Sequence, residues 1–486
     1  MLLRSRILAI VALGFVLGSL SCNALLTSSG PTGQPPAPDQ PPTPLLPAAP
    51  IERGNLLTPA QFQYLGAFRL PGNEPRPRTF EYGGSAMTFR AGGDPAGPED
   101  GFPGSLFLTG HDRLPYGELP DGDQVAELSI PVPLATRVLD ELPQAEFLQG
   151  FHDVARGRFA GLDEIPRVAM LYLDDPLTGP KIHLAWGQHL QPDPPAASHT
   201  WFDPDLSAPG MPDPWFIRGQ SPYAVNGYMF EIPEGWATRY AGGRRLAIGR
   251  YRDGGWSGMG PSLLAYQPWG ADGSPPAGGS QVEVLPLLLY QNSETSDDFT
   301  QSLAGYQHPD EWEGGAWITT PGGASAVLFA GTKATGNKSW YGFVHPEGPE
   351  IPCVAGDLVG QFPVCRMQDG APCPDSDLTE CAGHSDYRGW WSTRFDAQFL
   401  LYDPADLAAV ATGESAAWQP QPYTTIDLDD VLLLNPAEVE SDMLGSGDQR
   451  RYRIGEVAYD RTVNRLYVLE LFADGAKPVV HVWGID

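Results

Sequence analysis

The sequence predicts an all-β protein, a five-bladed β-propeller closed by an N-terminal strand. One strand-turn-strand pattern, with a third strand a little later, recurs five times between residues 83 and 485. A single unit of this kind cannot bury its apolar face, so five units predict a closed radial array. The last unit lacks a fourth strand, and Gln63–Leu70 stands unpaired ahead of the first unit. We expect this strand to complete the last blade and remove its open edge.

Each blade is expected to contain four strands in chain order. The first and second strands are Gly83–Arg90 with Ser105–Gly110, Arg167–Leu173 with Lys181–Trp186, Gly227–Ile232 with Arg245–Tyr251, Gly314–Thr319 with Ala326–Thr332, and Gly455–Asp460 with Arg465–Leu471. The third strands are Gln124–Ile130, His199–Leu206, Ser262–Gln267, Ala397–Asp403 and Val479–Ile485. Fourth strands in blades one to four are Glu146–His152, Trp215–Gly219, Val282–Gln291 and Thr424–Asp430. Glycine at the start of several first strands fits the crowded inner position of a propeller.

The N-terminal region predicts export. Residues 1–21 carry Arg4 and Arg6 and then an apolar run, which is typical of a secretory signal peptide. Cys22 follows at once and favours lipidation over plain cleavage, although Ser19 stands where a lipobox normally has Leu. Residues 22–50 are Pro-rich and are expected to form an extended tether, which leaves 51–486 for the propeller.

Four of the five cysteines fall in one insertion, at about 343–389, where no repeat strand is expected. They are Cys353, Cys365, Cys373 and Cys381. In an oxidising compartment an even set of this kind predicts two disulfides that staple the insertion. Zinc is the alternative, but the spacings are wider than those of paired zinc ligands.

The net charge of −29 argues against nucleic acid as a partner. Such a chain has no broad basic surface with which to neutralise phosphates. We expect an exported monomer that contacts the membrane only through its lipid anchor and faces the periplasm or the cell exterior.

Candidate site residues gather at one mouth of the predicted propeller. Inner strands begin, and second strands end, on the same face of the molecule. The catalytic candidates there are Glu313, Glu81, His111 and Asp112, and the binding candidates are His189, Arg250, Trp256 and Lys333. Carboxylates beside imidazoles can do acid–base work or hold a metal. The alternatives are a hydrogen-bonding role for Glu313, a turn made by His111 and Asp112, and packing for the loop tryptophans.

The segment Glu311–Trp317, followed by the strand Ala326–Thr332, resembles the Glu-Gly-x segment of five-bladed arabinanase/xylosidase-type glycosidases. The resemblance implies that Glu313 is a general acid. Those enzymes also use an Asp base. On their first blade they carry a motif similar to Arg-Asp-Pro, and this chain has Glu81-Tyr82-Gly83-Gly84 at that place instead.

A longer similarity covers Tyr64–Pro71, Gln124–Pro131 and Val457–Trp483. In these stretches the chain resembles uncharacterised bacterial exported propeller proteins. That resemblance implies export and the propeller fold, but no activity.

Two functions follow from these patterns. The first is a cell-surface propeller that binds or cleaves carbohydrate at its mouth, which leaves glycoside hydrolase activity open. The alternative is a non-catalytic scaffold or adhesion module with a structural cation, such as calcium, on the axis. A glycosidase needs two carboxylates about 5–5.5 Å apart for retention or about 6.5–9.5 Å apart for inversion.

Overall fold

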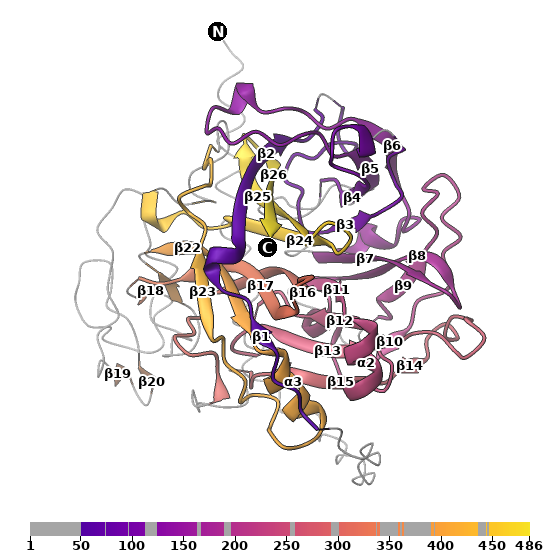
Figure 1. The fold of residues 1–486 in the computed structure, drawn as a ribbon, viewed down its shortest axis with the longest axis vertical. Coiled ribbons are helices and arrows are strands. Elements are labelled where there is room, and N and C mark those ends of the chain that lie inside the picture. The colour runs from indigo at the N-terminus through magenta and orange to yellow at the C-terminus, as the bar shows by residue number, and fades with distance from the viewer. Residues whose placement is uncertain are drawn as a thin grey trace. The chain divides into compact units, whose positions relative to one another are not determined.

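The computed structural model describes residues 50–72, 74–95, 97–111, 124–162, 167–188, 196–252, 258–292, 301–336, 338–340, 358–359, 362–363, 390–392, 394–435, 444 and 447–486. Contacts divide the chain into Met1–Leu45, which lies outside the described residues, and Leu46–Asp486. The second unit is all-β, and its five small sheets are arranged as a five-bladed β-propeller (Figure 1).

The blades follow one another along the chain, and the strands of each blade pair antiparallel with one another. Blade 1 contains β3 (Met87–Arg90), β4 (Ser105–Thr109), β5 (Val125–Ser129) and β6 (Phe147–His152), and blade 2 contains β7 (Arg167–Asp175), β8 (Gly179–Gly187) and β9 (His199–Phe202). Blade 3 contains β11 (Tyr228–Glu231), β12 (Leu246–Gly249), β13 (Ser262–Tyr266) and β15 (Val284–Leu289). Blade 4 contains β16 (Glu311–Thr319), β17 (Ala324–Ala334), β22 (Phe395–Tyr402) and β23 (Thr424–Asp427). Blade 5 contains β24 (Ile454–Asp460), β25 (Arg465–Asp474), β26 (Lys477–Ile485) and β2 (Phe62–Arg69).

The first strands of the blades form a closed ring around the axis. Strand β3 contacts β7, β7 contacts β11, β11 contacts β16, β16 contacts β24, and β24 contacts β3 again. The prediction of five blades is therefore confirmed. Every inner strand presents its residues to a neighbour on each side, so small side chains and glycine are favoured there.

Five apolar clusters fill the spaces between adjacent blades. Ala86 and Val168 belong to the cluster between blades 1 and 2, and Phe230 and Phe329 to the one between blades 3 and 4. One further cluster lies between each remaining pair of adjacent blades, namely 2 and 3, 4 and 5, and 5 and 1. Alternate residues of each strand point to opposite faces of its sheet, which explains why one strand serves two clusters.

The predicted fourth strand of blade 2 divides its pairing between two blades. Trp215 makes a single antiparallel bridge to His199 of β9. The next residues form β10 (Phe216–Ile217), which pairs in parallel with β14 (Gln281–Val282), beside blade 3. Successive N–H groups of a strand point to opposite sides. The Trp215 N–H therefore donates to His199 O in blade 2, whereas the Phe216 N–H donates to Ser280 O beside blade 3.

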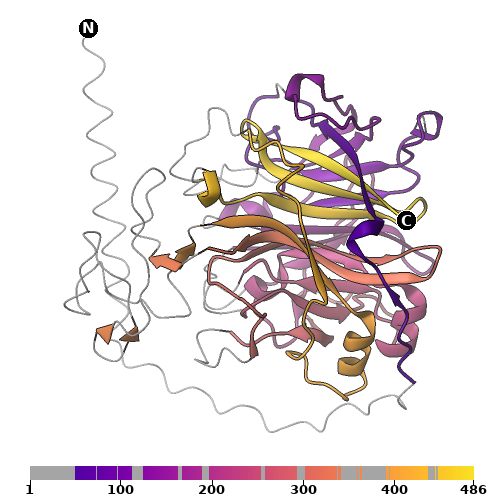
Figure 2. The same cartoon turned by 60° about the vertical axis from the view of Figure 1, so that its left-hand side comes forward.

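Strand β2 pairs antiparallel with β26, from Phe62 opposite Ile485 to Arg69 opposite Val479. In both views the indigo strand runs beside the yellow strands of blade 5 (Figures 1 and 2). Ahead of it, β1 (Asn55–Leu56) pairs in parallel with the start of β17.

Helices are few in the described part of the chain. The two α-helices, α2 (Glu234–Tyr240) and α3 (Pro404–Ala411), each follow a strand, and Asp403 caps α3 by accepting from Ala405 N. The ends of the insertion pair as β18 (Lys338–Trp340) and β21 (Trp390–Ser392), and β19 (Leu358–Val359) pairs with β20 (Phe362–Pro363). Among the described residues, no helix is both long and apolar enough to span a membrane.

Candidate functional site at the propeller axis

Two glutamates and one arginine gather where the inner strands begin. Arg167 is the first residue of β7, Glu313 lies near the start of β16, and Glu456 lies near the start of β24. The exposed fractions of these residues are 1%, 1% and 0%. Three different blades therefore contribute one buried charged or ionisable side chain each.

Both glutamates sit in irregularities of their strands. In blade 4 the register of the ladder shifts between Trp312 and Gly314, at Glu313. In blade 5 the register shifts between Ile454 and Val457, which leaves Glu456 in the same position. A β-bulge re-aims the side chain of its extra residue. We infer that the two bulges turn these glutamates toward each other.

Blades 4 and 5 approach closely at this point. A Cβ added to Gly314 would lie 2.5 Å from Val457 N and 2.9 Å from Glu456 Oε1. Glycine is therefore required beside Glu313, because any side chain would push the two inner strands apart.

Arg167 holds Glu313 in an ion pair. The distance from Arg167 Nη2 to Glu313 Oε1 is 3.1 Å. The Arg167 guanidinium also lies 3.5 Å from the centre of the Tyr251 ring, a cation–π geometry. Tyr251 donates in turn to Glu311, which pairs with Arg252 at 3.5 Å. One buried polar network thus runs through blades 2, 3 and 4.

Burial favours the protonated form of Glu456. Burial raises its pKa well above the ordinary range, and the charge of Glu313 raises it further, against the hydrogen bond donated by Val457 N to Oε1 at 2.9 Å. Its Oε2 is buried and has no hydrogen-bond partner among the residues that the structure describes. The site therefore places a proton-holding acid beside a carboxylate whose charge is neutralised by arginine. A substrate could use this pair as acid and base only through a local opening, since both groups are buried.

The raised pKa of Glu456 predicts a pH-dependent loss of stability. Above the ordinary carboxyl pKa of about 4.3, the unfolded chain releases a proton that the folded protein retains. The stabilisation present at lower pH is then lost as the pH rises toward the folded pKa. A Glu456→Gln variant keeps the acceptor for Val457 N and cannot titrate. Its melting temperature should fall less than that of the wild type from about pH 4 to 8; parallel melting curves would contradict this assignment.

The structure gives the predicted catalytic residues different degrees of burial. Glu81 is at the surface, 43% exposed, and pairs with Arg76 at 3.1 Å. His111 is buried, with its ring 5.5 Å from that of Tyr82. Glu313 lies in the buried network described above. The expectation that these three side chains line a solvent-accessible mouth does not hold for Glu313 or His111, because packing between blades buries both.

Arg250 and Lys333, expected to bind ligand, are buried and hold nearby loops. Arg250 donates to Gly260 O at 2.9 Å and to Tyr290 O at 3.3 Å. Lys333 Nζ pairs with Asp310 at 3.0 Å and donates to Gly305 O at 2.7 Å.

Several other candidates fall outside the described residues. They are Cys22, Asp112, His189, Trp256, Cys353, Cys365, Cys373 and Cys381. Four further tryptophans were expected in loops but lie in strands: Trp312 in β16, Trp340 in β18, and Trp390 and Trp391 in β21. Trp312 is 1% exposed, so it packs in the core.

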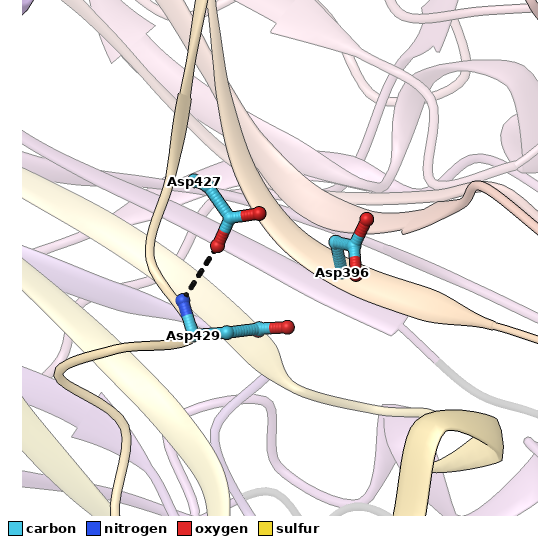
Figure 3. A group of neighbouring side chains, drawn as sticks. All are labelled: Asp396, Asp427 and Asp429. Atoms are coloured by element: carbon cyan, nitrogen blue, oxygen red, sulfur yellow. Dashed lines mark hydrogen bonds between the residues drawn. The ribbon is translucent and has the colours of Figure 1, made fainter.

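One group of three carboxylates in the described residues has the spacing of a metal site. Ligand oxygens of Asp396, Asp427 and Asp429 lie within 4.8 Å of one another (Figure 3). However, Asp396 pairs with Arg394 at 2.7 Å and Asp429 with Arg453 at 3.0 Å. Two arginines supply the positive charge that a cation would bring, and the cluster lies on β22 and at the end of β23 rather than at the axis. We assign it to structural ion pairing.

A cavity of about 230 Å³ opens at the other mouth, where the inner strands end. All five inner strands line it, through Met87–Phe89, Leu171–Asp174, Met229–Glu231, Gly315–Trp317 and Val457–Thr462. Asp174 and Thr462 at its rim are exposed, so the cavity reaches solvent. On β16 and β24 its lining begins one or two residues after Glu313 and Glu456.

A second ion network surrounds this axial cavity. Glu231 binds two arginines, Arg245 through Oε1 and Arg461 through Oε2 at 3.1 Å. Arg245 also pairs with Asp175 at 3.1 Å, and Arg461 donates to Trp317 O at 2.7 Å. Residues of blades 2, 3, 4 and 5 are thereby tied together across the axis.

The sequence contains a pattern that indicates a strand bulge at Glu456, but little that indicates the residues of the axial cavity. The motifs Glu313-Gly314-Gly315 and Gly455-Glu456 place glycine beside glutamate inside a strand, which is typical of a bulge. Tyr172 and Tyr459 lie on inner strands and resemble ordinary strand aromatics. Only their place in the ring shows that both line a cavity.

The fold and the axial geometry define the class of this protein as a five-bladed propeller with an axial cavity. No protein-family model matches the chain, and no curated protein matches it.

Proposed function

We propose that the protein is an exported propeller that binds carbohydrate in the axial cavity. The observation that carries this proposal is the cavity of about 230 Å³, open at one mouth and lined by aromatic and firmly held polar side chains. It is smaller than the roughly 300–1,000 Å³ of sites for drug-sized ligands. One sugar ring, at the end or side of a glycan, suits this size better than a longer segment.

The lining combines the two kinds of contact that a sugar needs. Tyr172 and Tyr459 are partly exposed and offer ring surface to the apolar face of a pyranose. Arg245, Arg461 and Glu231 are held in place by their mutual ion pairs. Polar groups that are already fixed lose little freedom when they bind hydroxyls.

The proposal predicts a specific effect of the tyrosine rings. A protein comprising residues 51–486 should bind at least one glycan on a glycan array. The double variant Tyr172→Ala with Tyr459→Ala should bind that glycan about tenfold more weakly, because it loses two ring contacts. Tyr459→Phe, which keeps the ring, is the matched control and should bind like the wild type. Unchanged binding by the double variant would show that the glycan binds outside the axial cavity. Absence of any glycan ligand would favour the scaffold alternative.

Cleavage of the bound glycan is a second candidate function. The adjoining carboxyl groups of Glu456 and Glu313, beside the inner end of the cavity lining, favour it. Glu456 would serve as general acid and Glu313 as base or nucleophile. If the protein hydrolyses a glycan that it binds, Glu456→Gln should abolish hydrolysis and leave binding intact; retained hydrolysis would exclude this role.

Export, lipidation of Cys22, two disulfides among the four clustered cysteines, and closure of the propeller by β2 also belong to this proposal. Their support is the N-terminal sequence, the even number of cysteines and the pairing of β2 with β26. Thiol titration of the unreduced, unfolded mature protein should find none of the four cysteines free. Two or more free thiols would exclude the disulfides.

A further inference from the structure

We propose that the axial cavity selects a ligand with a positive charge, namely the protonated amino group of an amino sugar in a glycan. This inference rests on the proposed carbohydrate function and names the class of sugar. Its basis is the charge balance of the cavity wall together with the aromatic rings beside it.

The cations of the cavity wall are already neutralised. Arg245 pairs with Asp175 at 3.1 Å and with Glu231, and Arg461 pairs with Glu231 at 3.1 Å. Arg461 makes further bonds to the carbonyl oxygens of Trp317 and Glu231, at 2.7 Å and 2.6 Å. These two arginines therefore have little attraction left for an acidic sugar.

Two carboxylates of the cavity wall are not neutralised by an ion pair in the described part of the chain. Within the described part of the chain, neither Asp174 nor Asp460 forms an ion pair, and both line the cavity. Asp460 is fully buried: its Oδ1 accepts from Thr462 N at 2.7 Å and Oγ1 at 2.6 Å, while its Oδ2 has no hydrogen-bond partner among the described residues. A ligand with a positive charge can donate to the exposed Asp174, and the buried Asp460 carboxylate attracts the same charge at longer range.

Aromatic rings stand beside these carboxylates. Tyr172 precedes Asp174 by two residues on β7, and the charge of Asp174, after burial, helps raise the Tyr172 pKa. Tyr459 precedes Asp460 on β24, its hydroxyl donates to Asn464 Oδ1 at 2.7 Å, and the Arg461 guanidinium already lies 5.4 Å from the centre of its ring. The face of the Tyr172 ring can attract an ammonium group, and the nearby Asp174 carboxylate adds to that attraction.

The whole chain favours the same sign of ligand. Its net charge of −29 attracts cations and repels uronic acids or sulfated glycans at low ionic strength. The cavity of about 230 Å³ then selects among cations by size, because it accommodates a single ring with its amino group.

A matched pair of oligosaccharides tests this inference. Titration calorimetry at low salt should compare a β-1,4-linked glucosamine tetramer with its fully N-acetylated counterpart, which has the same rings without the charge. We expect the amine form to bind residues 51–486 at least tenfold more tightly. Asp174→Asn should reduce that preference to threefold or less. Because Asp174 is exposed, this variant should fold normally.

Asp460→Asn provides a second measurement at the buried carboxylate. It should reduce the same preference, and its thermal unfolding should be recorded to establish that it is folded. Equal affinity of the wild type for the two tetramers would overturn the inference and leave carbohydrate binding in place. If no saccharide of any kind bound, the inference and the proposed function would both be overturned.

Discussion

Replacing Arg167 by methionine should lower the free energy of unfolding by about 3–5 kcal/mol, because it leaves the Glu313 carboxylate buried without its partner. Both side chains of this pair are 1% exposed, and their atoms are 3.1 Å apart. The substitution also removes the guanidinium from the Tyr251 ring. Chemical denaturation monitored by tryptophan fluorescence would measure the change.

A surface arginine gives the control for this substitution. Arg218 pairs with Glu283 at 2.9 Å, but the two side chains are 60% and 61% exposed. Arg218→Met should cost less than about 1 kcal/mol, because water screens that pair. The double variant Arg167→Met with Glu313→Gln should recover much of the loss. If Arg167→Met were no more harmful than Arg218→Met, the buried network would not hold the axis.

Removal of β2 should have the second large effect. Phe68 and Leu70 are fully buried, and Tyr64 on this strand bonds to His481 at 2.9 Å, which in turn pairs with Glu470 at 2.8 Å. Loss of the strand would remove these contacts and leave β26 as an open edge. Each large buried side chain contributes about 2–5 kcal/mol, so the sum approaches the whole stability of a typical domain, about 5–15 kcal/mol.

The experiment compares two truncations. A variant that begins at Pro71 should aggregate or lack a cooperative thermal transition. A variant that begins at Ile51 keeps β1 and β2 and should melt like the full chain. A stable, monomeric Pro71 variant would show that the ring does not depend on this strand for closure.

The repeat pattern was sufficient to predict the blades. Alternating apolar residues with glycine at the inner strands imply radial packing, and the observed ring of β3, β7, β11, β16 and β24 follows that pattern. The fourth strand of blade 2 was predicted less well. Near Trp215 the choice between β9 and β14 depends on which blade lies nearer, and local sequence carries no such information.

The candidate site could be predicted only in part, because exposure depends on how blades pack. Sequence position placed Glu313 and His111 at one mouth, but burial between blades removes both from the surface. The pairing of Glu313 with Arg167 joins residues 146 positions apart and leaves no local pattern. The axial cavity is likewise made by five strands, of which no single one has a recognisable ligand motif.

Carbohydrate binding in the axial cavity is the central claim about this protein, and a crystal structure with the glucosamine tetramer tests it most directly. We expect one sugar ring within the cavity, between Tyr172 and Tyr459, with its amino group within hydrogen-bonding distance of Asp174. A tetramer bound at the opposite mouth or on the outer strands, with the axial cavity holding only water, would contradict the claim.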